Sequence, residues 1–119
     1  MQISSYYAAW FTKDAEASVA AHEAVGFKVK HHLKEYDGMD IYVMESSDGS
    51  RMDIVSVQAA LPHSGARVNV DNLEEAIQVF REQGFEVYGE IHSSKSNRAA
   101  LLYHDANSAT YFVIQHMKG

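Results

Sequence analysis

The sequence predicts an α+β fold in which one strand, one helix and three further strands occur twice in succession. Two observations carry this prediction. Each half of the chain holds a helix-like segment that ends in Gly-Phe and is followed by a run of strand-like segments, at Gly26-Phe27 and at Gly84-Phe85. The two halves also match at a nearly constant separation, which is the pattern that an internal repeat leaves.

The first half begins with a strand and a helix. Residues 3–11 are rich in aromatic and β-branched side chains, and the run stops at Thr12 and Asp14, either of which can cap a helix. Residues 15–25 are rich in alanine, with apolar side chains at helical spacing, and Gly26 stands where a left-handed helix terminator is expected.

Three strands complete the first half, at residues 27–36, 39–45 and 51–57. Turn-forming residues separate them, at Asp37-Gly38 and at residues 46–50. The first module, residues 1–58, therefore reads βαβββ.

The second half follows a connector at residues 58–65, which contains Pro62 and ends in Ser64-Gly65. We expect a short strand at residues 66–70, capping residues at 71–72, and a helix at residues 73–84 with an apolar stripe along one face.

Strands are expected again at residues 85–91, 98–104 and 110–116, with loops at residues 93–97 and 105–109. The second module, residues 63–119, is therefore a second βαβββ unit, and residues 1–119 are expected to form a single domain.

The repeat can be followed residue by residue. A separation of 58 relates the two helices and a separation of 59 relates the two closing strands, and the matched pairs are Gly26 with Gly84, Asp14 with Asn72, Val19 with Ile77, Asp48 with Asn107, and Ile54 with Val113. One insertion accounts for the change of register, as expected for a duplicated unit.

Composition limits the classes of function. At 119 residues and 13.3 kDa the chain has room for one globular domain. Its 10 Lys and Arg against 16 Asp and Glu give a net charge of -6, which argues against nucleic acid as a partner. An acidic surface would instead suit a basic ligand.

The chain has no cysteine, so disulfides and thiolate metal ligands are excluded. No segment approaches the roughly 18 apolar residues of a membrane span, and the first residues lack the pattern of a signal peptide. We therefore expect a protein with no membrane association and a cytoplasmic location.

The tandem βαβββ pattern resembles the vicinal oxygen chelate superfamily, which includes glyoxalase I, bleomycin-resistance proteins and extradiol dioxygenases. The most specific stretch is residues 68–87, VNVDNLEEAIQVFREQGFEV, which is similar to the pattern V.DLEEAI..L...GFEV found at that place in many members. The resemblance implies a cupped, half-open, eight-stranded mixed sheet with the helices outside and a ligand in the concavity between the modules. It is also compatible with a homodimer.

Metal-dependent members of this superfamily usually carry a His on the first strand and a Glu on the last strand of each module. Those positions fall on Tyr7 and Asp53 in the first module and on Gly65 and Phe112 in the second, so only Asp53 offers suitable chemistry. The resemblance therefore implies a site without a cofactor. The alternative is a divalent metal held by a divergent set made of Asp53, His63 and His116.

A concave face with aromatic and a few polar side chains suits a small organic ligand. The expected ligand-binding residues are Phe11, Arg51, Arg67, Asn69, Phe112, Ile114 and His116, and the expected catalytic residues are Asp53 and Tyr7. The apolar members of the set could equally fill a closed interior.

Asp53 lies between Met52 and Ile54 in a central strand, where an unpaired carboxylate would be costly to bury. It therefore needs Arg51, Arg67, a metal or a ligand as its partner. A structural salt bridge with Arg67 and a functional role both remain open at this point.

Three functions follow. The first is a metal-free cup that binds a small organic molecule, as the bleomycin-resistance proteins do. The second is a metal-dependent lyase, isomerase, epimerase or dioxygenase of the same superfamily, with Asp53 as ligand or base and Tyr7 as proton donor. The third is an interaction scaffold with no small ligand.

Overall fold

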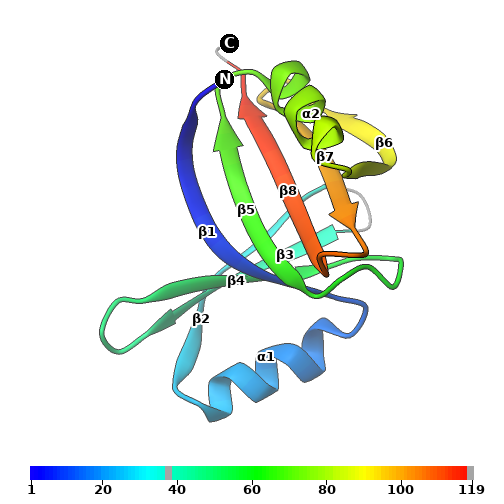
Figure 1. The fold of residues 1–119 in the computed structure, drawn as a ribbon. Coiled ribbons are helices and arrows are strands. Elements are labelled where there is room, and N and C mark those ends of the chain that lie inside the picture. Colours follow the sequence, from blue (N-terminus) through cyan, green and yellow to red (C-terminus); the bar gives the residue numbers. More distant parts are fainter. Residues whose placement is uncertain (37–38, 118–119) are drawn as a thin grey trace.

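The computed structural model describes residues 1–36 and 39–117 and contains eight strands and two helices in the predicted order (Figure 1). The elements are β1 (Ile3–Thr12), α1 (Ala15–Ala24), β2 (Phe27–Tyr36), β3 (Met39–Ser46), β4 (Arg51–Ser56), β5 (Ser64–Val70), α2 (Leu73–Glu82), β6 (Glu86–Ser93), β7 (Asn97–His104) and β8 (Ala109–His116). The predicted turn at Asp37-Gly38 lies outside the described residues.

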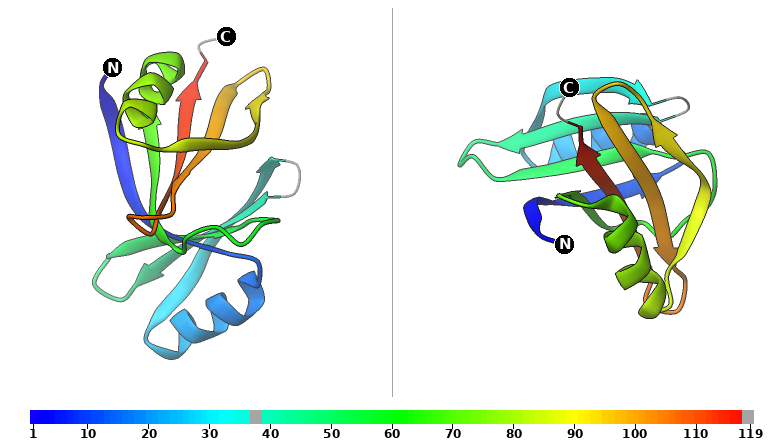
Figure 2. Two further views of the ribbon diagram at one scale, coloured as in Figure 1. Left: turned by 45° about the vertical axis from the view of Figure 1, so that its right-hand side comes forward. Right: turned by 90° about the horizontal axis from the view of Figure 1, so that it is seen from above.

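All eight strands form one mixed sheet in the order β2-β3-β4-β1-β5-β8-β7-β6. Within each module the first and last strands pair in parallel, β1 with β4 and β5 with β8, and the remaining pairs are antiparallel. The antiparallel pair of β1 and β5 joins the modules. Figures 1 and 2 show the two halves of the sheet curling about this pair, with α1 and α2 on the outside. The predicted α+β fold, with its half-open mixed sheet and outer helices, is confirmed.

Both helices begin and end as the repeat predicts. Asp14 accepts a hydrogen bond from the backbone N–H of Ala17 in α1, and Asn72 accepts one from the backbone N–H of Glu75 in α2, each at 3.1 Å. Gly26 and Gly84 follow the two helices with φ of +115° and +92°, a conformation that favours glycine.

The predicted connector is too long. Ser64 and Gly65 lie in β5, where they pair with Trp10 and Ala9 of β1. Pairing on both edges of a strand outweighs the local turn preference of a Ser-Gly pair. The other boundaries differ by one or two residues, which is the usual uncertainty at the ends of elements.

Two apolar cores lie on opposite faces of the sheet. The concave face joins both modules through a cluster made of Ala9, Phe11, Met39, Ile41, Val55, Val57, Ala99, Leu101, Phe112 and Ile114. The convex face of the second module packs against α2, which buries Leu73, Ala76 and Ile77. Apolar burial on both faces therefore stabilises the curled sheet.

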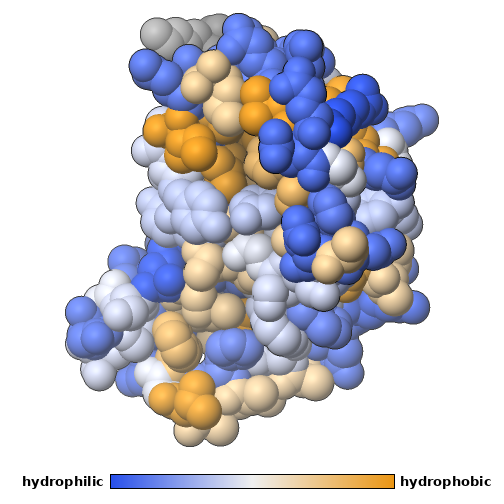
Figure 3. Space-filling model, viewed as in Figure 1, coloured by the Kyte–Doolittle hydropathy of each residue, from blue (hydrophilic) through white to orange (hydrophobic). Residues whose placement is uncertain are grey.

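The two helices are not equivalent. α2 has a continuous apolar stripe, whereas α1 buries none of its residues and is followed by Val25, which is 74% exposed. Figure 3 shows that the apolar residues on this side of the molecule form small separate patches among polar ones. In the described part of the chain, neither helix has the length and hydropathy needed to cross a membrane.

The contact between β5 and β8 leaves no room for a side chain at residue 65. A Cβ atom built on Gly65 would lie 1.5 Å from the carbonyl oxygen of Thr110, which is its partner in β8. The backbone of Gly65 is not in the left-handed region, so this requirement is purely steric.

We expect Gly65→Ala to lower the free energy of unfolding by about 3 kcal/mol or more, because the backbone of β8 must move to admit one methyl group. Urea denaturation followed by the fluorescence of Trp10 measures this loss.

Gly49→Ala is the matched control. Gly49 has a φ of +87° and nothing within 4 Å of its built Cβ, so only backbone strain of about 1 to 2 kcal/mol is expected. Equal losses for the two variants would contradict the steric account.

Candidate functional site between the modules

The pairing of β1 with β4 and β5 brings polar residues from three strands together on the concave face. Tyr7 lies opposite Arg67 on β5, and Ala9 lies opposite Asp53 on β4. Because side chains alternate along a strand, Tyr7, Arg51, Asp53 and Arg67 all face the concave side. Sequence reasoning predicted all four as site residues, and the structure brings them into one group.

The carboxylate of Asp53 holds two arginines. Arg51 donates from Nε to Oδ1 at 3.1 Å and from Nη2 to Oδ2 at 3.3 Å, and Arg67 donates from Nε to Oδ2 at 2.7 Å. The Asp53 side chain is 0% exposed, so both of its oxygens are shielded from water and are satisfied by charged donors. We call Arg51, Asp53 and Arg67 the arginine–aspartate cluster.

Tyr7 lies against this cluster. The Cζ atom of Arg51 is 3.6 Å from the centroid of the Tyr7 ring, and the Cζ atom of Arg67 is 6.0 Å from it. The short contact is typical of a cation–π interaction. Sequence reasoning placed these residues on one face but did not predict this stacking, because alternation fixes the face of a side chain and not its rotamer.

The arginines remain accessible. The side chain of Arg51 is 26% exposed and that of Arg67 is 14% exposed, although their shared carboxylate is fully buried. Two guanidinium groups and one carboxylate give the cluster a net charge of +1. The chain as a whole has a net charge of -6, so the charge of this site is opposite in sign to the net charge of the chain.

Two further predicted residues, Asn69 and His116, make hydrogen bonds nearby on the same face. The side-chain amide of Asn69 donates to the hydroxyl of Ser5 at 2.6 Å, and its Oδ1 atom is buried without a partner. Nδ1 of His116 lies 2.5 Å from the amide oxygen of Asn97. These residues extend the polar side of the concave face beyond the arginine–aspartate cluster.

The apolar residues predicted to line the site are inside the protein. Phe11, Phe112 and Ile114 are fully buried in the cluster that joins the modules. One cavity between the two modules has a volume of about 130 Å³ and is lined by Met39, Val57 and Gln58 from the first module and by Tyr88, Gly89, Glu90, His92 and Leu101 from the second. Only a small molecule, or one end of a larger one, fits this cavity, and no residue of the arginine–aspartate cluster lines it.

The metal positions implied by the family resemblance do not have the donors that a divalent ion needs. Both oxygens of Asp53 are bonded to guanidinium groups, and Gly65 has no space for a side chain. Tyr7 and Phe112 complete the four positions, and neither suits most divalent metals.

The structure also does not bring the alternative ligands Asp53, His63 and His116 together. Nδ1 of His63 bonds the carbonyl oxygen of Phe11 at 2.6 Å, and its ring stacks on Trp10 with centroids 4.9 Å apart. Within residues 1–36 and 39–117, no group of three or more His, Cys, Asp or Glu side chains could hold a metal ion.

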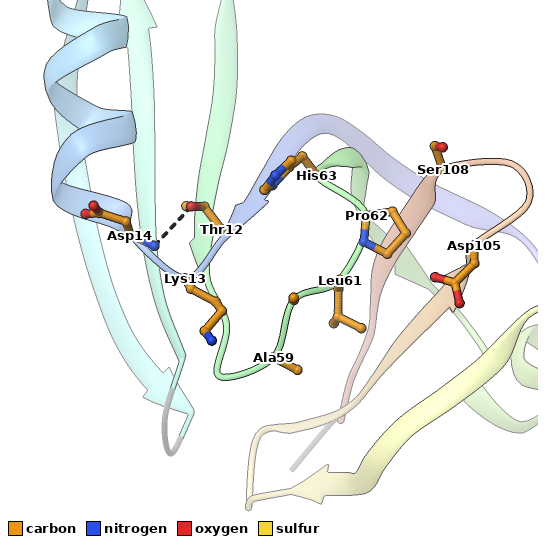
Figure 4. Close-up of a pocket in the computed structure, with 10 residues that line it drawn as sticks. Thr12, Lys13, Asp14, Ala59, Leu61, Pro62, His63, Asp105 and Ser108 are labelled. Carbon is orange, nitrogen blue, oxygen red and sulfur yellow. Dashed lines mark hydrogen bonds between the residues drawn. The ribbon is translucent and has the colours of Figure 1, made fainter.

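Two grooves of about 500 Å³ or more among the described residues lie away from the arginine–aspartate cluster. One, of about 500 Å³, is formed by the segment after β1, the connector between the modules and the turn before β8, and Figure 4 shows Lys13 beside the connector residues Ala59 and Leu61. The other, of about 980 Å³, lies between α2 and β6. The first groove could not have been predicted from the sequence, because loop residues show no regular alternation of apolar and polar side chains.

Comparison with known proteins shows the fold. No family model matches the chain, and no curated protein matches it. A glyoxalase I variant from Zea mays superposes with a TM-score of 0.67 at 13% identity, over 98% of this chain and 44% of the maize chain. This chain therefore spans less than half of that protein.

Two smaller proteins match over almost their whole length. A variant of methylmalonyl-CoA epimerase from Streptomyces coelicolor, in complex with 2-nitronate-propionyl-CoA, has a TM-score of 0.53 at 16% identity, over 94% of this chain and 96% of that one. A hypothetical protein from Bacillus halodurans has a TM-score of 0.55 at 14% identity, over 95% and 94%. The predicted resemblance is confirmed at the level of the fold.

We expect Asp53→Ala to lower the free energy of unfolding by about 3 kcal/mol, because it removes the shared partner of two half-buried guanidinium groups. Urea denaturation measures the loss.

Glu74→Ala serves as the control, because it breaks an ion pair with Arg98 on the exposed surface and is expected to cost less than about 1 kcal/mol. A loss for Asp53→Ala as small as that of the control would show that the buried carboxylate does not hold the two modules together.

Proposed function

We propose that this chain, which has the fold of the vicinal oxygen chelate superfamily, binds a small organic ligand at the seam between its modules without a metal ion. The observation that carries the proposal is the arginine–aspartate cluster, whose two arginines are partly exposed at the concave face and one of which, Arg51, lies over the ring of Tyr7. Charged donors beside an aromatic ring are typical of sites that orient small ligands.

Electrostatics supports the metal-free part of the proposal. Two guanidinium groups lie within hydrogen-bonding distance of the Asp53 carboxylate. A divalent ion that binds this carboxylate would have to displace them or lie close beside them. Repulsion between these cations and the metal opposes binding at such short range. The metal-dependent alternative would therefore require Arg51 and Arg67 to leave Asp53.

The roles of the residues follow from their contacts. Asp53 positions the two arginines, Tyr7 supports the guanidinium of Arg51, and the accessible sides of both arginines meet the ligand. Phe11, Phe112 and Ile114 are buried in the apolar cluster on the same face of the sheet, so they leave no open space there for the ligand. The proposal assigns no chemical step to Asp53 or Tyr7.

The neighbours in fold are compatible with a small organic ligand. One of them, the methylmalonyl-CoA epimerase from Streptomyces coelicolor, was obtained with 2-nitronate-propionyl-CoA bound. At 16% identity this likeness supports a seam ligand only through the shared fold. A cytoplasmic location and a homodimer remain predictions of the sequence.

A thermal-shift screen of neutral, cationic and anionic organic compounds, run with EDTA present, tests the proposal. A ligand at about 100 times its Kd is expected to stabilise the protein by about 2.7 kcal/mol, which is several degrees in Tm. Adding Mn²⁺ or Zn²⁺ in place of EDTA should leave the shift unchanged. Absence of stabilisation by any compound, or stabilisation that EDTA abolishes, would contradict the proposal.

Tyr7→Ala locates the site. We expect this change to weaken binding of a stabilising compound about tenfold, because the ring supports Arg51 by a cation–π contact. Tyr6→Ala is the matched control, since Tyr6 is the preceding residue of β1, points to the opposite face and is 56% exposed. Calorimetric titration of both variants measures the difference, and equal weakening would place the ligand elsewhere.

A further inference from the structure

We infer that the ligand is a small carboxylate, bound by the terminal nitrogens of Arg67 and Arg51. The two guanidinium groups would then supply the positive charge that a metal ion supplies in the metal-dependent proteins of this fold. This inference rests on the proposed function, because it names the chemistry of the ligand at the same site. It starts from the donors that Asp53 leaves unused.

Each arginine has N–H groups to spare. Arg67 uses only Nε on Asp53, and neither of its terminal nitrogens donates to any residue within the described ranges. Arg51 uses Nε and Nη2, and its Nη1 likewise has no acceptor among the described residues. A guanidinium presents five N–H donors in a fixed plane, so several donors remain at a partly exposed place.

The charge of the site selects the sign of its ligand. The arginine–aspartate cluster carries +1, and one carboxylate would bring it to neutrality. Glu45, which lies opposite Arg51 on β3, is already paired with Lys30 at 3.0 Å and adds no net charge. A cationic ligand would meet two arginines at close range, so the expectation drawn from the acidic composition of the whole chain does not hold at this site.

The shape and the charge of the site together favour a carboxylate. A planar carboxylate accepts two parallel hydrogen bonds from one guanidinium, which is a geometry that an isolated ammonium cannot offer. Phosphate can form the same paired hydrogen bonds, but much of it is a dianion at neutral pH, and a dianion leaves a net negative charge on a cluster of charge +1. The apolar cluster behind the site is closed, so the carboxylate end of a ligand enters and any larger part stays outside.

Matched pairs of compounds test the inference. Acetate, lactate, malonate and benzoate are compared with their amides by calorimetric titration at low ionic strength with EDTA present. We expect at least one carboxylate to bind at least tenfold more tightly than its amide and more tightly than inorganic phosphate, with affinity that falls as salt is added. Equal affinity for acid and amide, tighter binding of phosphate, or no binding of any of the four carboxylates would overturn the inference.

Two variants locate the contact. Arg67→Met should weaken carboxylate binding at least tenfold, and Arg67→Lys should recover only part of it, because lysine keeps the charge but loses the planar pair of donors. Arg98→Met is the control, since Arg98 pairs with Glu74 on the exposed surface. Circular dichroism and Tm show whether each variant is folded. If Arg67→Met does not fold, Arg67→Lys still provides the test. Full binding by a folded Arg67→Met or Arg67→Lys protein would overturn the inference.

The two proposals fail differently. If neutral or cationic compounds stabilise the protein in a way that depends on Tyr7 while no carboxylate binds, the proposed ligand site at the seam is supported and the inference of a carboxylate ligand is wrong. If no compound of any charge binds, the proposed function is itself wrong.

Discussion

The antiparallel pairing of β1 with β5 is the constraint on which the rest of the structure depends. It joins two copies of one unit edge to edge, and its register places Tyr7 opposite Arg67 and Ala9 opposite Gly65. β4 pairs with the other edge of β1. The carboxylate of Asp53 therefore lies where Arg51 of the first module and Arg67 of the second can both bond it. Loss of this pairing would separate the modules and leave Asp53 without its partner from β5.

The seam combines two kinds of stabilisation. Apolar side chains from both modules fill most of the concave face, and burial of that surface favours the curled sheet. The polar end of the same face is held by a buried carboxylate with two cations. Such a group is a weak source of stability in itself, but it fixes two partly exposed arginines in one arrangement that leaves some of their donors unused. A site whose first contacts are already positioned can bind a ligand at a lower entropic cost.

Sequence reasoning predicted the fold, and it placed the residues of the candidate site on one face of the sheet without predicting their contacts. Gly26 and Gly84 mark the ends of the two helices. Because matched positions of the two modules keep a nearly constant separation, the sequence predicts the order of all ten elements. The need of Asp53 for a partner follows from its place in an apolar strand, and Arg51 and Arg67 were among the expected candidates. The state of Phe11 and Phe112 could not be predicted, because alternation gives the face of each side chain while the curvature of the sheet decides how closely the two halves approach. Ser64 was misplaced for a related reason, since pairing with β1 outweighs its local preference.

The central claim, that ligand binding uses the free donors of Arg51 and Arg67, can be tested by ¹⁵N-edited NMR of the guanidinium groups. The chain has four arginines, so Arg81 and Arg98 serve as internal controls. On titration with the tightest-binding carboxylate, the account predicts chemical-shift changes at the side-chain nitrogens of Arg51 and Arg67 and none at those of Arg81 and Arg98. Saturable changes at Arg81 or Arg98, with Arg51 and Arg67 unaffected, would contradict it.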